Sequence, residues 1–403
     1  MQQIIFEDPY QFVPPHRGNR WPEFLGLFLA RILRKSYGVA ELECRGTERF
    51  QKSLDAGHGI LLAANHCRPA DPFVVGLFAR RMPVNLYVMA SWSVFKQSRL
   101  QTFIARRLGA FSLYREGMDR ASVNTAIEMM ENAQRPLVIF PEGVISRTND
   151  RLGEMMEGTA FMARQAARKR AKADPNSKVV IHPIAVKYQF QGQLEQSLQP
   201  VLTEIEERLT WRPQSHLPLF DRVKQIGAAL VALKEMEFLG QPGSGSLHER
   251  IGRLVDHLLT PLETEWLKSP QTGDAVARVK NLRVAILPDM VEGRVTDAER
   301  DRRWRQLADL YLAQQLWFYP ADYVTQDSSA ERFLETVEKF EEDLTDTTRV
   351  HGPWKAVLQV GDAIEVSPDR HKRIPEDPLM VELKNSMTSM LGSLVAELTS
   401  QTQ

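Results

Sequence analysis

The sequence is poor in cysteine, has no net charge and lacks any long apolar run. Only two cysteines, Cys44 and Cys67, occur in 403 residues. That excludes a disulfide scaffold or a cysteine-rich zinc module and favours a reducing compartment. The 51 Lys and Arg residues balance 51 Asp and Glu residues. A dedicated nucleic-acid binder needs an excess of positive charge to displace counterions, so we expect no nucleic-acid partner.

No segment has the length and apolarity of a membrane span. A helix that crosses a bilayer needs about 20 apolar residues, and the most apolar early stretch, 24–33, is shorter and contains Arg31. The first ten residues also lack the basic start and apolar core of a secretory signal. We therefore expect a cytoplasmic protein, peripherally associated with the cytoplasmic face of the membrane.

The balanced total hides two halves of opposite charge. Residues 1–190 hold 27 Lys and Arg against 17 Asp and Glu, whereas residues 191–403 hold 24 against 34. A surplus of positive charge suits an anionic lipid surface or a ligand that carries phosphates. We therefore expect any attachment to a membrane surface to involve the first half.

Residues 21–37 predict one amphipathic helix. Trp21, Phe24 and Phe28 recur at helical spacing, and Arg34 and Lys35 follow near the end of the segment. Two interpretations stay open, because periodicity does not separate them. The apolar stripe could pack on the protein core, or it could lie in a membrane interface, which suits aromatic residues with a basic margin.

Short apolar runs alternate with helical patterns between residues 39 and 190. The strand candidates are 40–45, 59–64, 84–90, 110–114, 136–140 and 179–187, and the helix candidates are 72–81, 95–107, 118–133 and 153–171. This alternation predicts an α/β fold with a mostly parallel sheet flanked by helices. In such sheets, ligands bind beyond the carboxyl ends of the strands.

The second half of the chain predicts an all-helical stretch. Between residues 193 and 350 apolar positions recur at helical spacing, and we expect about five helices, two of them separated by the Gly- and Pro-containing segment 240–246. A strand pattern returns at 354–366. Asp377 followed by Pro378 then predicts the start of a final helix that reaches about residue 399.

A candidate catalytic pair directly follows the strand predicted at 59–64. His66 comes just after this strand, and Asp71 follows five residues later. A histidine with a nearby carboxylate is the base-and-orienter part of a catalytic triad, and no protein nucleophile is needed if the substrate supplies the hydroxyl. The alternative is structural: Asp71 could cap the helix predicted at 72–81, with His66 an ordinary loop histidine.

Two further segments follow apolar strands. Gly109–Arg115 (GAFSLYR) ends in an arginine, whose planar fork binds phosphate or carboxylate. Phe140–Arg147 (FPEGVISR) forms a tight loop in which Gly143 permits close approach of a ligand and Glu142 and Arg147 supply charge. The alternative for the second segment is an ordinary connection from a strand to a helix.

A fourth segment, VVIHPIAVKY, carries His182 and Pro183 inside a buried strand. Proline has no N–H to donate to a sheet, so Pro183 predicts a bend or an edge position. We expect His182 to have a structural role.

Taken in order, NHCRPAD, GAFSLYR, FPEGVISR and VVIHPIAV resemble the four motifs of the glycerolipid acyltransferases, of the lysophosphatidate and glycerol-phosphate acyltransferase kind. The His-x4-Asp and FPEG elements lie about 75 residues apart, each after a strand, and carry most of the resemblance. The resemblance implies four parts: an N-terminal amphipathic segment (1–38), an acyltransferase α/β domain (39–192), a helical insertion (193–350), and a closing strand and helix (351–403).

The resemblance also implies an activity and roles for individual residues. The protein would be an O-acyltransferase that moves a fatty acyl group from acyl-CoA or acyl carrier protein to a hydroxyl of a glycerolipid or lysophospholipid. His66 would be the general base, oriented by Asp71. Pro183 would lie on the acyl-donor side, and no metal or redox cofactor would be needed. The residues implied on the acceptor and phosphate side are Gly109, Arg115, Glu142, Gly143 and Arg147.

One departure from the family pattern affects the acceptor. The third motif of the family usually continues from FPEG with Thr-Arg-Ser, but Val144, Ile145 and Ser146 stand here. Ile145 cannot bind phosphate, so either Arg147 takes that role or the acceptor lacks a phosphate there, as a lyso-aminolipid would. Two other classes stay open: a hydrolase that uses the His-Asp pair on water, and a non-catalytic lipid-binding protein with the same fold.

Overall fold

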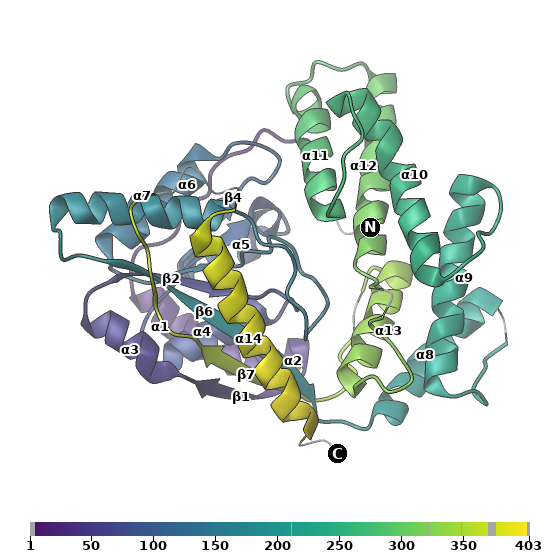
Figure 1. The fold of residues 1–403 in the computed structure, drawn as a ribbon, viewed down its shortest axis with the longest axis horizontal. Helices are drawn as coiled ribbons and strands as arrows, with labels where there is room; N and C mark the ends of the chain where they lie inside the picture. The colour runs from purple at the N-terminus through teal and green to yellow at the C-terminus, as the bar shows by residue number, and fades with distance from the viewer. Residues whose placement is uncertain (1–4, 211, 321, 348, 370–375, 401–403) are drawn as a thin grey trace. The chain divides into compact units, whose positions relative to one another are not determined.

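The computed structural model describes residues 5–210, 212–320, 322–347, 349–369 and 376–400. The chain forms two compact units, which Figure 1 shows as a part built around a sheet and a part made of helices. The α/β unit consists of Gln11–Tyr114, Met118–Gly192 and Gly352–Gln403. The helical unit consists of Met1–Tyr10, Arg115–Gly117 and Gln193–His351.

In the described part of the chain, the α/β unit is built on one sheet of eight strands, in the order β1-β7-β6-β2-β5-β3-β4, with β8 paired to β6. Its strands are β1 (Val39–Arg45), β2 (Gly59–Ala64), β3 (Tyr87–Ser91), β4 (Ala110–Leu113), β5 (Leu137–Ile139), β6 (Val179–Phe190), β7 (Trp354–Val360) and β8 (Ile364–Glu365). Neighbours are parallel except where β6 pairs with β7 and β8. The predicted α/β fold with a mostly parallel sheet is thus confirmed.

Helices cover both faces of this sheet. The unit contains α1 (Arg20–Gly26), α2 (Leu29–Tyr37), α3 (Thr47–Asp55), α4 (Asp71–Arg81), α5 (Arg99–Arg107), α6 (Arg120–Asn132), α7 (Gly158–Ala173) and α14 (Pro378–Ser400). Leu61 and Ile181, which point to one face, share a core cluster with residues of α6, α7 and α14. On the other face, His182 contacts Phe50 of α3, and Phe50 contacts Phe78 of α4. Alternate strand residues are therefore buried on opposite sides, which explains the uninterrupted apolar runs in the sequence.

Several element boundaries differ from the predictions. The helix expected over 21–37 is two helices, because α1 ends at Gly26 and the chain turns at Leu27 and Phe28 before α2 begins. The helix expected over 95–107 is a 3₁₀ turn at Trp92–Phe95 followed by α5. Helix α3 was not predicted, because its nine residues bury only Phe50 and Ser53 and so carry little periodic signal.

Pro183 lies in a central strand, so the edge position offered for it is wrong. Strand β6 has β2 on one side and β7 and β8 on the other. Pro183 pairs with Ala63 of β2, but on its other side it faces the gap between Val360, where β7 ends, and Ile364, where β8 begins. No ladder partner there requires an N–H from this position, so the proline is tolerated.

Among the residues that the structure describes, the helical unit contains six helices between β6 and β7, one more than the number expected. They are α8 (Leu194–Thr210), α9 (Leu219–Leu239), α10 (Leu247–Leu267), α11 (Ala275–Val291), α12 (Asp297–Trp317) and α13 (Ala330–Thr345). The predicted breaker at 240–246 does separate two of them, α9 and α10. Among the residues described, no helix combines the length and apolarity that crossing a bilayer requires.

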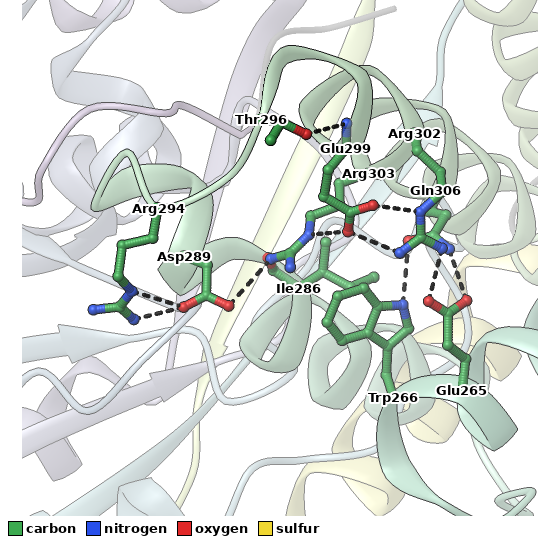
Figure 2. A network of polar contacts seen from close by, with 10 residues as sticks. All are labelled: Glu265, Trp266, Ile286, Asp289, Arg294, Thr296, Glu299, Arg302, Arg303 and Gln306. Atoms are coloured by element: carbon green, nitrogen blue, oxygen red, sulfur yellow. Dashed lines mark hydrogen bonds and ion pairs between the residues drawn. The ribbon is translucent and has the colours of Figure 1, made fainter.

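A polar network joins α10, α11 and α12 (Figure 2). Arg303 donates to Glu299 at 2.8 Å and to the carbonyl oxygen of Ile286 at 2.9 Å, and its guanidinium lies 4.6 Å from the ring centroid of Trp266. Trp266 in turn donates to Gln306 at 3.2 Å. The buried cation therefore has both an anionic partner and an aromatic face, which offset the loss of its hydration.

Candidate active site

Two loops meet at one edge of the sheet, as the sequence predicts. Strands β2 and β5 are parallel neighbours, so their carboxyl ends lie side by side. Residues 65–71 follow β2, and residues 140–147 follow β5. The two loops are joined directly, because the N–H of Ser146 donates to the carbonyl oxygen of His66 at 2.8 Å.

His66 and Asp71 form a hydrogen-bonded pair at this edge. Nδ1 of His66 lies 2.9 Å from Oδ2 of Asp71, whose side chain is fully buried. The same oxygen accepts the N–H of Arg68 at 2.9 Å. The imidazole is 13% exposed and stacks on Phe140 with 4.3 Å between ring centroids. A buried carboxylate at Nδ1 favours the tautomer with the proton on Nδ1, so Nε2 keeps a free lone pair.

Asp71 does not act as a helix cap. It is the first residue of α4, and the capping position belongs to Ala70. Among the described residues, the hydrogen bonds found for its carboxylate come from His66, Cys67, Arg68 and Tyr188, and none comes from the N–H groups of α4. The capping interpretation therefore gives way to one in which Asp71 holds His66.

Tyr188 is a member of the site that the sequence analysis missed. Its hydroxyl donates to Oδ1 of Asp71 at 2.6 Å, and burial, with the neighbouring Asp71 charge, raises the pKa of this phenol well above its ordinary value of 10.0. The backbone of Tyr188 is itself fixed by the buried side chain of Asn149, which accepts its N–H at 2.6 Å and donates to its carbonyl oxygen at 2.7 Å. The sequence carries only weak signals for these two residues. Tyr188 lies near the end of a strand, and Asn149 follows shortly after Arg147.

Asn65 fixes the start of the His66 loop in the same way. Its buried amide accepts the N–H of Val186 at 2.7 Å and donates to the carbonyl oxygen of Val186 at 3.0 Å. Strand β6 therefore supports the pair through two asparagines, one on each loop. Such support keeps the pair within the narrow geometry that catalysis requires.

Glu142 holds the two loops together. One of its oxygens accepts the N–H of His66 at 2.7 Å, and the other accepts the N–H of Gly153 at 2.8 Å. The side chain is buried and carries two hydrogen bonds from the backbone, so its contacts are those of a residue that positions His66. Both carboxylate oxygens are occupied by these bonds, so Glu142 does not offer a free carboxylate to an acceptor substrate.

The pKa of Glu142 is raised from its ordinary value of 4.5 to about 7, first because the carboxyl is buried and also because Asp71 is close, although the two backbone N–H groups oppose the shift. The folded state therefore binds this proton more tightly than the unfolded chain does. The resulting stabilisation is fully present below about pH 4.5 and is lost as the pH rises to about 7. We expect the free energy of unfolding to fall by up to about 3 kcal/mol over this range because of Glu142.

The measurement is the free energy of unfolding against pH for the native protein and for Glu142→Gln. The difference between the two curves should shrink or change sign between about pH 4.5 and 7. Glu48→Gln, which removes an exposed carboxyl elsewhere in the same unit, is the matched control and should leave the slope unchanged. Parallel curves for the native protein and Glu142→Gln would contradict the assignment.

Gly143 and Arg147 lie in the loop after β5, as predicted. Gly143 has a φ of +70° and donates its N–H to the carbonyl oxygen of Phe140 at 3.0 Å, so a glycine is required for this turn. Arg147 also has a positive φ, +56°, which is uncommon for a residue with a side chain. Such backbone conformations persist only where the surrounding structure enforces them, and they cluster at functional sites.

Gly109 does not join these residues. It precedes β4, which runs parallel to the other strands of this half of the sheet, so it lies at the edge opposite to His66. Its φ is +93°, and a Cβ atom there would lie 2.3 Å from the carbonyl oxygen of Leu86. The glycine is explained by close packing of the backbone, and the expected contact with an acceptor is not supported.

Arg115 and Pro183 stand apart from the loop residues in different ways. Arg115 groups with the helical unit, together with Glu116 and Gly117. Pro183 is buried inside β6, one residue after His182. His182 is structural as expected: its ring nitrogens lie 2.9 Å from the hydroxyl of Ser53 and 3.0 Å from the carbonyl oxygen of Gly361, so both are occupied.

The polar groups at the sheet edge are suited to proton transfer. His66 presents Nε2, while Asp71, Tyr188 and Glu142 hold the ring and its backbone. In the part of the chain that the structure describes, no three His, Cys, Asp or Glu side chains lie close enough together to hold a metal ion. The arrangement can accept a proton from a hydroxyl group placed at Nε2.

A comparison with protein families agrees with this geometry. Residues 41–187 match the family model described as Acyltransferase. No curated protein matches the chain in sequence. The matched range includes His66, Asp71 and Glu142 but ends one residue before Tyr188, and it does not reach the helical unit. Over residues 41–187 the chain is therefore similar to the acyltransferase domains that this family model describes.

Proposed function

We propose that the protein is an O-acyltransferase that transfers a fatty acyl group from an acyl thioester to a hydroxyl of a glycerolipid or lysophospholipid. The observation that carries this proposal is the 2.9 Å contact between His66 Nδ1 and the buried carboxylate of Asp71, at the ligand-binding edge of an acyltransferase domain. The donor is acyl-CoA or an acylated carrier protein, and 1-acylglycerol 3-phosphate is the acceptor suggested by the motifs.

The proposed course of acyl transfer follows from the geometry of the His66–Asp71 pair. Nε2 of His66 takes the proton from the acceptor hydroxyl as the oxygen attacks the thioester carbonyl, and Asp71 stabilises the imidazolium that forms. The tetrahedral oxyanion then collapses, the carbon–sulfur bond breaks, and the departing thiolate takes the proton back from His66. The products are an ester and a free thiol. Arg115, Gly143 and Arg147 are proposed on the acceptor side and Pro183 on the donor side.

The test of this function follows the fate of the acyl group. Purified protein is incubated with labelled long-chain acyl-CoA and a panel of lysolipids, with and without a phosphate or an amine in the head group. An acylated lipid formed only in the presence of a lysolipid is the expected result. Free fatty acid without acylated lipid would indicate a hydrolase, and an unchanged thioester would indicate a binding protein.

We further propose that the protein attaches to anionic membranes through an apolar patch on α1, α2 and α5. Phe24 of α1 is 53% exposed, and Leu27, in the turn that follows, is 59% exposed. Phe28 of the same turn is also exposed and contacts Phe24. Helix α5 adds Leu100 and Phe103, both exposed. The patch is continuous, because Trp21 of α1 packs on Phe103 with 5.4 Å between ring centroids. Leu29 and Leu33 of α2 are buried, which supports core packing for these two positions, and the membrane role is proposed for the exposed residues of the segment.

The margin of this patch is basic. The guanidinium of Arg107 lies 5.1 Å from the ring centroid of Trp21 and 5.0 Å from that of Phe103. Further cations are exposed on the same helices: Arg31, Arg34, Lys35, Arg99 and Arg106. Aromatic and aliphatic side chains surrounded by Lys and Arg are typical of a surface that enters the head-group region of an anionic bilayer.

Replacing Phe24 and Phe28 together by aspartate is expected to weaken binding to vesicles that contain anionic lipid by at least about tenfold, because two apolar contacts are lost and two negative charges are added. Sedimentation with vesicles measures the effect. Phe161→Asp is the matched control, since Phe161 is 54% exposed on α7 and lies outside the patch. Equal binding by the double variant and the control would remove the patch as the attachment site.

A further inference from the structure

Arg68 lies two residues after His66, in the loop that carries the His66–Asp71 pair. Its backbone N–H donates to Oδ2 of Asp71 at 2.9 Å, the same oxygen that contacts His66. The residue is only 9% exposed. Burying a guanidinium is costly unless other groups offset its lost hydration. The surroundings of this side chain therefore decide whether the loop keeps the conformation that the pair requires.

Trp354 provides the closest aromatic contact found for Arg68 in the described part of the chain. The guanidinium carbon of Arg68 lies 3.9 Å from the ring centroid of Trp354 and 5.6 Å from that of Tyr188. Trp354 is 1% exposed and is among the largest fully buried side chains. An indole face is the best aromatic partner for a cation, and the attraction is strongest where water is excluded. The ring of Trp354 thus offsets part of the cost of burying Arg68.

The position of Trp354 is fixed by the strands on both sides of it. Trp354 is the first residue of β7, which the chain reaches only after α13. Its N–H donates to the carbonyl oxygen of Gly38, just before β1, at 2.8 Å. On the other side Trp354 pairs with Phe190 of β6, and the centroids of the two rings lie 5.2 Å apart. The indole is therefore held in one place, against which the guanidinium packs.

The contacts of Arg68 and Tyr188 converge on Asp71. The hydroxyl of Tyr188 donates to Oδ1 of Asp71 at 2.6 Å, and the N–H of Arg68 donates to Oδ2. The Asp71 side chain is fully buried, so its charge depends on such donors and on nearby positive charge. Burial raises the pKa of Tyr188, and the Arg68 charge opposes this shift. The positive charge of Arg68 therefore acts within the group of residues that surrounds Asp71.

We propose that Trp354 is a positioning residue for the His66–Asp71 pair, and that it acts by holding the guanidinium of Arg68. Without the indole, Arg68 would move toward water and draw its loop, and with it Asp71, away from Nδ1 of His66. The role of the pair in acyl transfer rests on the proposed function, whereas its dependence on Trp354 does not. Trp354 lies outside the matched range 41–187, so the strand that closes the sheet would complete the site.

The geometry of the pair is tested by NMR on the full-length protein with isotope-labelled histidine. A proton on Nδ1 that is hydrogen-bonded to a buried carboxylate gives a far-downfield signal, and loss of this signal in His66→Ala identifies it. We expect the signal in the native protein and its loss in both Trp354→Leu and Arg68→Met. Trp354→Phe, which keeps an aromatic face for the guanidinium, should retain it.

Tyr87→Leu is the matched control for this measurement. Tyr87 is also a buried ring that faces a buried arginine, since the guanidinium of Arg135 lies 4.9 Å from its ring centroid. It begins β3, at the edge of the sheet opposite to His66. Tyr87→Leu should lower the midpoint of thermal unfolding and keep the signal. An unchanged signal in Trp354→Leu or Arg68→Met, or its absence from the native protein, would overturn the inference; if Trp354→Leu does not fold, Arg68→Met decides.

Kinetics test whether Trp354 acts through Arg68. Trp354→Leu and Arg68→Met should each lower kcat for acyl transfer by about 10- to 100-fold and leave KM nearly unchanged, because the substitutions displace the pair and not the substrates. The double variant should be no slower than the slower single variant, since both changes remove one contact. Losses in kcat that multiply, or an unchanged kcat, would contradict the proposal. If the protein transfers no acyl group, the proposed function fails, and the NMR signal still decides the role of Trp354.

Discussion

Replacing Asp71 by asparagine is expected to lower kcat for acyl transfer by about 10³- to 10⁴-fold. The carboxylate accepts at both oxygens: Oδ2 from His66 and the N–H of Arg68, and Oδ1 from Tyr188. Asparagine has one acceptor oxygen, so its NH2 group must replace an acceptor on one side. With the amide toward His66, Nδ1 becomes the acceptor and the ring proton moves to Nε2, which then cannot take a proton from the acceptor hydroxyl.

The measurement is the steady-state rate of ester formation, with the midpoint of thermal unfolding taken as a check on folding. Asp377→Asn is the matched control, because Asp377 is also a buried aspartate that accepts a guanidinium, that of Arg164, at 2.5 Å. It lies at the start of α14, so its loss should affect stability more than kcat. A loss of less than about tenfold in Asp71→Asn would show that the histidine does not need the carboxylate.

The fold was predictable where strands are buried on both faces. Uninterrupted apolar runs such as residues 59–64 identify central strands directly, and the loops that follow them hold both His66 and Glu142. The position of β7 was not predictable, because it pairs with β1 and β6 across the intervening helical unit. Pairing over so many residues leaves no local pattern in the sequence.

The site was predictable only in part, for a similar reason. The spacing of His66 and Asp71 is local, and a helix that begins at Asp71 brings the two side chains together. Tyr188 reaches Asp71 from a strand 117 residues away. A tyrosine at the end of an apolar strand has the same sequence pattern as any core tyrosine, so only the structure shows that its hydroxyl completes the site.

Gly109 was expected in the site, but its position in the fold has another explanation. Its place in the motif GAFSLYR suggests contact with a ligand, but the glycine is needed because the backbone of Leu86 passes too close for any Cβ atom. Glu142 shows a related change of role, since both of its oxygens bind backbone N–H groups. A motif shows that a residue type is needed at a position, but only the contacts around that position show which role the residue has.

His66→Ala is expected to slow acyl transfer by about 10²- to 10⁴-fold, which is the usual contribution of a positioned general base. The remaining rate reflects alignment of donor and acceptor, which the substitution leaves in place. Removing the ring also exposes Phe140, on which it stacks, so a small loss of stability is expected as well. Imidazole in the buffer should restore part of the rate, because it can take the place of the missing base.

The most direct test of the account is the single-turnover rate at which labelled acyl-CoA is converted to acylated lipid by the native protein and by His66→Ala, at saturating donor and acceptor. We predict that the native protein forms the ester, and that His66→Ala binds the donor but forms ester at least about 100-fold more slowly, with partial recovery in imidazole. Ester formation by His66→Ala at the native rate would contradict the claim that His66 is the base.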